Sequence, residues 1–308
     1  MTTVLTVGET MALLDPVGDG PLDAGRTLTL RIAGAESNLA VALARLGVDV
    51  TWVSALGADA YGDVIERTLA AEGVQVLAQR DPGRPTGLFT KWRDGGRSHV
   101  LYHRHGSAAS ALRPEDVPDE LLADVELVHL TGITTALGEG PRALVHDLAR
   151  RAADHGATVL FDPNWRPLLW PSPAEAAAAQ RDLLGHVDWY LCGLEEGLLL
   201  WGGETAEDVT YAVRSAGAAN AVVRLGERGA LVDGELVPPA RVADVLDEIG
   251  AGDGFAAGFA WGLLRGLAPR DCVRAANAIA RAALAGTGDW ETFPTLTEIE
   301  HELTGGAA

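Results

Sequence analysis

The feature that most constrains the fold is an alternation of short strand-like runs with longer helical stretches. The strand-like runs are rich in β-branched and apolar residues and lie at 3–7, 49–53, 125–130, 158–162, 189–192, 221–225 and 230–232. Stretches rich in Ala and Leu lie between or after them, at 37–46, 61–72, 141–155, 173–184, 195–201, 206–216 and 254–267. This order is typical of a sheet whose strands are joined by crossover helices. The sequence therefore predicts an α/β fold with a doubly wound, mostly parallel central sheet flanked by helices.

Two regions interrupt this alternation. Residues 12–33 contain several Gly and Pro residues and end in a polar–apolar alternation at 27–32, and residues 86–104 alternate around the turn Asp94-Gly95-Gly96. Both patterns are typical of antiparallel hairpins. We expect two insertions, at about 12–33 and 86–112, to form a small β-sheet lid over the carboxyl edge of the main sheet, where open α/β folds bind ligands. Residues 1–308 are then one domain.

Composition excludes several classes of protein. The 308 residues are 47% hydrophobic, which is too apolar for a mainly disordered chain, and 43 acidic against 24 basic residues give a net charge of −19. Such a charge disfavours nucleic acid and anionic membranes as partners. We expect a cytoplasmic protein, because the chain starts without a basic leader region and has no uninterrupted apolar run long enough to span a membrane. Cys192 and Cys272 are expected to be reduced core thiols.

The most informative segment is Gly250-Ala251-Gly252-Asp253, which precedes a long helical stretch. Bare backbone N–H groups at a helix N-terminus attract anions. The Asp253 carboxylate suits a base that takes a hydroxyl proton while the neighbouring amides stabilise a transferring phosphoryl group. The alternative is that Asp253 only caps the helix.

Other nucleotide-site and hydrolase motifs do not fit. The stretch from Gly252 to Ala257 matches a dinucleotide-binding pattern in form, but it lies near the C-terminus without a first βαβ unit before it. The sequence contains no Walker A, HExxH or GxSxG motif.

The Gly250–Asp253 segment resembles the C-terminal signature of the ribokinase-like (PfkB) carbohydrate kinases, and residues 33–47 are similar to their N-terminal signature. The resemblance implies transfer of the ATP γ-phosphoryl group to a sugar hydroxyl, with Asp253 as base and Gly250, Ala251 and Gly252 as the anion hole. It places Gly34 and Asn38 on the substrate side. A glycine permits close backbone approach to a ligand, and an Asn can bridge hydroxyls. The alternatives are a turn at Gly34 and helix capping by Asn38.

The same resemblance assigns residues to the nucleotide. Leu225, Gly226 and Gly229 are similar to the strand–turn segment beside the ATP phosphates and base, and Asn277 corresponds to a residue near the nucleotide. A plain hairpin turn is the alternative for the two glycines.

Further residues resemble one subgroup, the 2-keto-3-deoxygluconate kinases. They lie in the segments 102–110, 130–134 and 162–166. In that subgroup the residues that match Tyr102, Arg104 and Arg166 contact the acid sugar, and guanidinium groups are natural partners of a carboxylate. For 162–166, a polar loop with an Asx turn is the alternative. Phe89 departs from the subgroup, which often has a Tyr there.

Two further departures concern ions. The family often has Asn-x-x-Glu near the Mg²⁺ water shell, and this chain reads Gly193-Leu-Glu-Glu196, so the resemblance implies a water-mediated route from Glu196 to Mg²⁺. Asp247-Glu248 replaces a frequent Asp-Thr, and the resemblance implies a monovalent cation such as K⁺ near Asp247. The extra carboxylate would either strengthen that site or replace its ion by a salt bridge.

The leading hypothesis is an ATP-dependent kinase of 2-keto-3-deoxygluconate. A fructokinase or another neutral-sugar kinase is the alternative within the family. A nucleotide-binding oxidoreductase and a non-catalytic sugar sensor are the alternatives from other classes. The exposed edge expected at residues 27–32 predicts a homodimer or a higher homo-oligomer.

Overall fold

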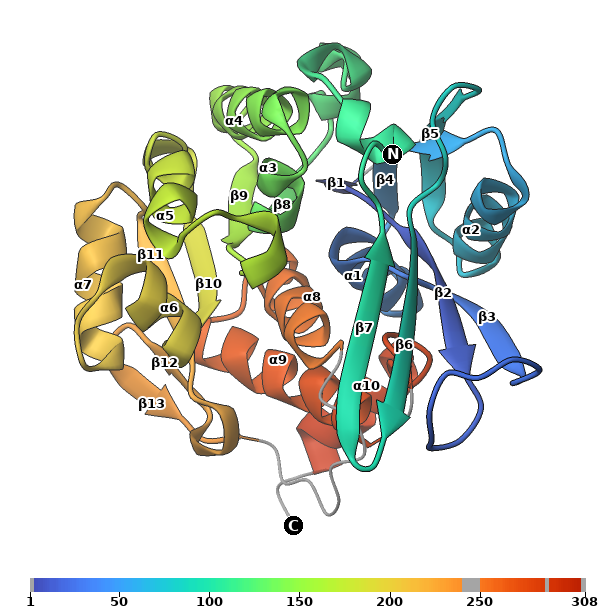
Figure 1. The fold of residues 1–308 in the computed structure, drawn as a ribbon. Coiled ribbons are helices and arrows are strands. Elements are labelled where there is room, and N and C mark those ends of the chain that lie inside the picture. Colours follow the sequence, from blue (N-terminus) through green and yellow to red (C-terminus); the bar gives the residue numbers. More distant parts are fainter. Residues whose placement is uncertain (1–2, 240–249, 286–287, 306–308) are drawn as a thin grey trace.

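A computed structural model describes residues 3–239, 250–285 and 288–305. Its main sheet contains nine strands among these residues, in the order β13-β12-β11-β10-β9-β8-β1-β4-β5 (Figure 1). The strands are β1 (Val4–Val7), β4 (Val50–Gly57), β5 (Gln75–Asp81), β8 (Leu127–Thr131), β9 (Thr158–Asp162), β10 (Trp189–Gly193), β11 (Asn220–Arg224), β12 (Ala230–Val232) and β13 (Glu235–Val237). The pairs from β11 through β5 are parallel, and β12 and β13 extend one edge in antiparallel fashion. The predicted α/β class is confirmed.

Helices cover both faces of this sheet (Figure 1). One face packs against α1 (Ala35–Arg45), α2 (Ala60–Ala71), α8 (Ala251–Leu264), α9 (Pro269–Leu284) and α10 (Leu296–Gly305). The other packs against α4 (Glu139–Asp154), α6 (Leu194–Trp201) and α7 (Ala206–Ser215), with α3 (Gly132–Ala136) and α5 (Pro173–Arg181) nearby. An apolar core therefore lies on each face of the sheet, because helices cover both faces and the strands carry apolar side chains on both.

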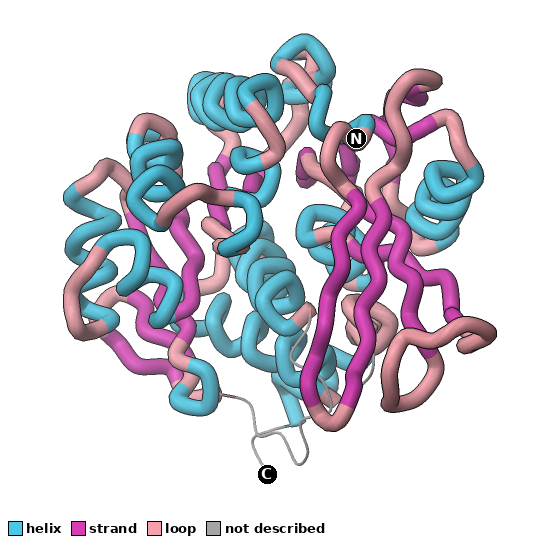
Figure 2. Tube along the Cα trace, in the orientation of Figure 1, coloured by secondary structure: helices cyan, strands magenta, loops and turns pink. Residues whose placement is uncertain are grey.

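The lid is a separate sheet in the order β3-β2-β6-β7, seen as its own group of strands in Figure 2. Its strands are β2 (Met11–Pro16), β3 (Leu28–Ala33), β6 (Leu88–Asp94) and β7 (Arg97–His103). Both predicted hairpins are antiparallel, as expected, and a parallel pairing of β2 with β6 joins them. The second insertion leaves the lid earlier than expected. After His103 the chain returns to the main body, where Ala109 and Leu112 join the core.

Local sequence accounts for the start of several helices. Asp59 and Thr205 cap α2 and α7 by accepting hydrogen bonds from backbone N–H groups of the first turn. The strand β5 was not predicted, because its sequence Gln-Val-Leu-Ala-Gln-Arg-Asp is half polar, as suits an edge strand. The helix predicted at 254–267 begins three residues earlier, at Ala251, so the glycine segment belongs to its first turn.

Within the described part of the chain, no helix is both long and apolar enough to cross a bilayer. Cys192 and Cys272 are both buried and free, as predicted.

Candidate active site

A cavity of about 980 Å³ opens at the carboxyl edge of the main sheet, beneath the lid. Its floor is formed by residues that follow the ends of β1, β8, β9, β10 and β11, and one wall by inward-facing residues of the lid strands. Lining residues include Glu9, Gly34, Asn38, Lys91, Tyr102, Arg104, Asp162, Asn164, Arg166, Glu196, Arg224, Leu225, Gly226, Gly250, Gly252, Asp253 and Asp289. A cavity thus lies at the edge of the sheet where the sequence predicts the site.

The first turn of α8 presents Asp253 to this cavity. Gly250 is the N-cap residue and adopts a left-handed conformation with φ of 77°. A Cβ atom there would lie 1.8 Å from the carbonyl oxygen of Asp289, so no other residue fits. The interpretation of Asp253 as a mere helix cap is wrong, because Gly250 holds that position. The Asp253 side chain instead accepts hydrogen bonds from Asn38 Nδ2 at 2.7 Å and Asn164 Nδ2 at 3.5 Å.

Burial raises the pKa of the Asp253 carboxyl from its ordinary 3.8 to about 7. The hydrogen bond from Asn38 and the positive charge of Arg166 oppose this rise, and the charges of Asp162 and Asp289 add to it. A carboxylate with a pKa near neutrality accepts a proton far more readily than a solvent-exposed Asp does.

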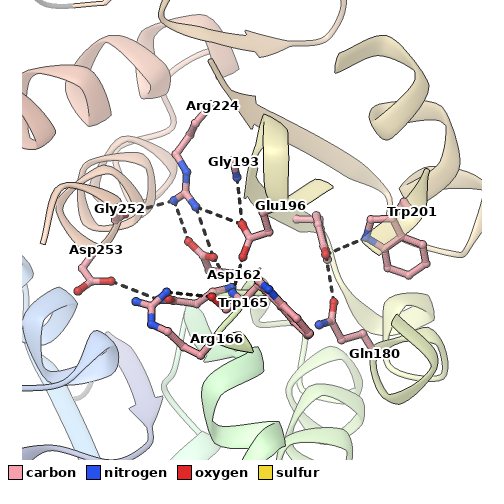
Figure 3. Close-up of polar contacts among 12 residues, drawn as sticks. Asp162, Trp165, Arg166, Gln180, Gly193, Glu196, Trp201, Arg224, Gly252 and Asp253 are labelled. Carbon is pink, nitrogen blue, oxygen red and sulfur yellow. Dashed lines mark hydrogen bonds and ion pairs between the residues drawn. The ribbon is translucent and has the colours of Figure 1, made fainter. Parts of the chain in front are cut away.

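A second network lies beside Asp253 and is centred on Arg224, at the end of β11 (Figure 3). Arg224 Nη1 donates to Asp162 Oδ2 at 2.8 Å and to the carbonyl oxygen of Gly252 at 3.4 Å, and Nη2 lies 3.8 Å from Glu196 Oε2. The two carboxylates raise the pKa of the guanidinium group despite its burial. The buried cation is therefore compensated, and it connects the end of β9 to the glycine turn of α8.

The end of the cavity near the lid carries aromatic and cationic groups. Tyr102 stacks on Phe89, with ring centroids 5.5 Å apart, and the Arg104 guanidinium lies 5.8 Å from the Tyr102 ring centroid. Arg104 also pairs with Glu9, where Nη2 and Oε2 are 2.5 Å apart. Arg166 follows β9 and lines the cavity near Asp253 (Figure 3). The cavity thus combines a basic carboxylate at a helix N-terminus with guanidinium groups that can bind an anion.

Comparison with known proteins gives this arrangement a family. The model of the pfkB family carbohydrate kinases matches residues 1–296. The chain belongs to this family. Among its relatives, a 2-dehydro-3-deoxygluconokinase of Bacillus subtilis is 36% identical over 97% of this chain and 95% of its own length. One of Thermoproteus tenax is 33% identical (98% and 94%), and a 2-dehydro-3-deoxygalactonokinase of Haloferax volcanii is 34% identical (99% and 98%).

Solved structures agree with this placement. A PfkB protein from Polaromonas sp. JS666 is 36% identical, covers 97% of this chain and 99% of its own, and superposes with a TM-score of 0.88. A candidate ribokinase II from E. coli in complex with ATP and Mg²⁺ is 25% identical, covers 99% of both chains and has a TM-score of 0.89. The ribokinase-like fold predicted for this pfkB kinase is confirmed.

The substrate-side signature of the pfkB kinases has structural duties in this chain. A Cβ at Gly34 would lie 2.4 Å from the carbonyl oxygen of Glu9, so the absence of a side chain at Gly34 lets the backbone of Glu9 pack closely against it. Asn38 is the fourth residue of α1. Its Nδ2 donates to Asp253, and its Oδ1 lies 3.4 Å from the backbone N of Gly34, a weak contact at the helix start. Contact of Gly34 and Asn38 with a sugar stays a prediction.

The nucleotide-side residues divide into two groups. Leu225 and Gly226 line the cavity, and a Cβ at Gly226 would have no neighbour within 4 Å. Gly229 is not among the described residues that line the cavity, and a Cβ there would lie 2.0 Å from the carbonyl oxygen of Val237. A place for Gly229 beside the nucleotide stays a prediction, with the hairpin turn as its alternative. Asn277 donates from Nδ2 to the carbonyl oxygen of Pro238 at 2.9 Å and is not among the described residues that line the cavity. Ala251 is the first residue of α8, behind the lining glycines.

The predicted ion sites have different outcomes. Glu196 lines the cavity, but its carboxylate already accepts hydrogen bonds from the backbone N–H groups of Trp165 and Gly193. Burial, followed by the charge of Asp162, raises the pKa of Glu196. A role for Glu196 toward Mg²⁺ through water stays a prediction. Asp247 lies outside the described residues.

Sequence reasoning missed Glu9 and Arg224, and noted Asp162 and Asn164 only as part of a loop. The loop does form the Asx turn of the alternative interpretation, because the backbone N–H of Asn164 donates to Asp162 Oδ1 at 2.9 Å. A signal existed for the first two residues. Each is a charged residue that ends or follows an apolar strand, at the edge where α/β folds bind ligands.

Proposed function

We propose that this pfkB kinase is an ATP-dependent kinase of 2-keto-3-deoxygluconate, which is also called 2-dehydro-3-deoxygluconate. The observation that carries the proposal is one cavity that holds Asp253 at the glycine start of α8 together with two guanidinium groups, that of Arg104 beside Tyr102 of the lid and that of Arg166 near Asp253. The first group suits phosphoryl transfer, and the second suits a substrate carboxylate. The names of the Bacillus and Thermoproteus relatives support the same substrate.

In the proposed reaction Asp253 acts as the base. Its carboxylate takes the proton of a substrate hydroxyl as that oxygen attacks the γ-phosphorus of ATP. The bond from the γ-phosphorus to the β–γ bridging oxygen breaks in line, and ADP leaves with the electron pair. Asn38 and Asn164 hold the Asp253 carboxylate in place through their amide groups. The raised pKa of about 7 lets the same group hold the proton until product leaves.

The anionic groups of ATP meet backbone dipoles at the glycine turn. Gly250 and Gly252 line the cavity at the positive end of α8, and the contact from Arg224 to the Gly252 carbonyl oxygen fixes the turn. The donor set fits Mg²⁺ held mainly through phosphate oxygens and water, since Asp162 and Glu196 are already engaged by Arg224. When bound, Mg²⁺ supplies neutralisation of phosphate charge.

A panel of acceptors tests the substrate. ADP release is measured with 2-keto-3-deoxygluconate, its C4 epimer 2-keto-3-deoxygalactonate, gluconate, fructose and ribose at equal concentration. We expect 2-keto-3-deoxygluconate to give the highest kcat/KM, by at least about tenfold over the neutral sugars, because a neutral sugar cannot pair with Arg104 and Arg166. A preference for fructose would assign the protein to the neutral-sugar kinases. Ligand binding without ADP release would indicate a sensor.

We also propose that the protein is a cytoplasmic homodimer or higher homo-oligomer. The support is the outer edge of the lid, where Leu28 and Leu30 of β3 are 40% and 42% exposed on a strand with only one neighbour among the described strands. Light scattering tests this, and a monomeric mass would contradict it.

A further inference from the structure

Glu9 lies where the lid joins the main body. Each of the two lid hairpins enters and leaves the main body once, which gives four connecting segments. Glu9 itself is in the first segment, between β1 and β2. The other three approach it closely. A Cβ at Gly34 would lie 2.4 Å from the Glu9 carbonyl oxygen, a Cβ at Gly87 would lie 2.7 Å from Glu9 Oε1, and Arg104 and Ser107 contact its carboxylate.

The Glu9 carboxylate is buried and holds groups from the fourth segment. Its side chain is 1% exposed. Ser107 Oγ donates a hydrogen bond to Oε1, and Arg104 Nη2 lies 2.5 Å from Oε2. Both partners follow β7, on the way back from the lid. Glu9 therefore joins the segment that leaves the main body to the segment that returns to it.

Arg104 forms an ion pair with Glu9, but two of its nitrogen atoms lack a hydrogen-bond partner among the described residues. Its side chain is 10% exposed, and its contact with Glu9 is an ion pair without hydrogen-bond alignment, since Arg104 Nε, Arg104 Nη2 and Glu9 Oε2 have no hydrogen-bond partner within the described part of the chain. A buried N–H group without an acceptor is costly. Nε and Nη2 are themselves buried, and Arg104 as a residue lines the cavity, so the contact with Glu9 sets how the guanidinium group is placed beside a ligand.

We propose that Glu9 is a positioning residue for substrate recognition. It holds the Arg104 guanidinium at the lid junction in the orientation in which Arg104 lines the cavity, where the carboxylate of the sugar acid would bind. Since Glu9 and Arg104 belong to two of the segments that connect the lid to the main body, binding of that carboxylate is coupled to the position of the lid. The inference rests on the proposed function and goes beyond it, because it gives Glu9 a role through Arg104 rather than in the transfer itself.

Simple electrostatics makes the opposite prediction, which sharpens the test. Removing the negative charge of Glu9 would make the cavity more attractive to an anion, and so would lower the KM for a sugar acid. Positioning requires the reverse, because a guanidinium group that loses its anchor must be ordered by the substrate itself. We expect Glu9→Gln to raise the KM for 2-keto-3-deoxygluconate at least about fivefold, with the KM for ATP within about twofold of wild type.

A double-mutant cycle shows whether Glu9 acts through Arg104. KM is measured for wild type, Glu9→Gln, Arg104→Gln and the double variant, and the dissociation constant of the sugar acid is measured by calorimetry. We expect the double variant to match Arg104→Gln alone. The matched control is Glu72→Gln, which breaks a partly buried ion pair elsewhere in the protein. Glu72 Oε2 lies 2.8 Å from Arg45 Nε, and neither residue lines the cavity. The control variant should leave both KM values unchanged.

Folding is checked by thermal unfolding. If Glu9→Gln does not fold, Ser107→Ala, which removes one hydrogen bond to the Glu9 carboxylate, takes its place and should raise the same KM by a smaller factor. A KM that is unchanged or lowered, or effects that multiply fully in the double variant, would overturn this inference while leaving the proposed function intact. Absence of turnover with the sugar acid in wild type would overturn the proposed function and this inference with it.

Discussion

Replacing Asp253 by Asn tests two properties of this carboxylate, its proposed role as a base and the effect of its buried negative charge on the stability of the fold. The amide has nearly the same size and can still hydrogen-bond to Asn38, but it cannot take a proton from a hydroxyl group. General-base catalysis typically contributes about 10²–10⁴ in rate. We expect kcat to fall by at least about 100-fold, with the dissociation constant of ATP changed by less than about threefold.

The same substitution is expected to stabilise the fold at neutral and alkaline pH. Burial raises the pKa of Asp253 from 3.8 to about 7, so the folded state holds this proton more tightly than the unfolded state does. The stability that this group contributes is then present below pH 3.8 and is lost as pH rises to about 7. At about 1.4 kcal/mol for each pH unit, the full difference is about 4 kcal/mol, an upper figure because Asp253 lines an open cavity. Between pH 5 and pH 8 the expected change is up to about 2.5 kcal/mol.

Urea unfolding at pH 5 and pH 8, with ADP release on the same samples, measures both effects. The free energy of unfolding of Asp253→Asn minus that of wild type should grow with pH. Asp154→Asn, whose side chain is 65% exposed and pairs with Arg150, controls for the loss of one negative charge. The reasoning is refuted if the difference is equal at both pH values, or if kcat stays within tenfold of wild type.

The remaining predictions concern other parts of the cavity. Arg166→Gln removes a cation that lowers the pKa of Asp253, so the acidic limb of the pH profile of kcat/KM should move to higher pH. The KM for the sugar acid should also rise about tenfold. An acidic limb that does not move would contradict the placement of Arg166 near Asp253. Lys91, the only lysine in the sequence, lines the cavity. Sugar acid together with a non-hydrolysable ATP analogue should slow the reductive methylation of Lys91 severalfold, as measured by peptide mass spectrometry. Equal labelling with and without these ligands would argue against this cavity as the substrate site. Gly250→Ala should lower the free energy of unfolding by about 1–3 kcal/mol or more in urea titrations. The φ of 77° at this position is strained for Ala, and the new Cβ would meet the Asp289 carbonyl oxygen. Unchanged stability would refute that contact. A cation site near residue 247 predicts faster turnover in K⁺ than in tetramethylammonium at equal ionic strength, and equal rates would exclude it.

Features encoded in contiguous residues were predictable. The alternation of strands and helices identified the α/β class, because side-chain periodicity reports burial directly. The segment from Gly250 to Asp253 could be interpreted as an anion site because its backbone conformation and its place at a helix start are local properties. The edge strand β5 escaped, since its burial is partial and its sequence lacks a clear period.

The sequence by itself therefore determined the fold class, the two lid hairpins and the family, and it indicated candidate residues for the proposed chemistry. Only the tertiary structure decided how those residues are held. Asn38 reaches Asp253 across 215 positions, Glu9 lies against Arg104 across the lid junction, and Arg224 joins Asp162 to the glycine turn. The raised pKa of Asp253 belongs to the same category. Burial and charge depend on which segments pack together, and no local pattern records that.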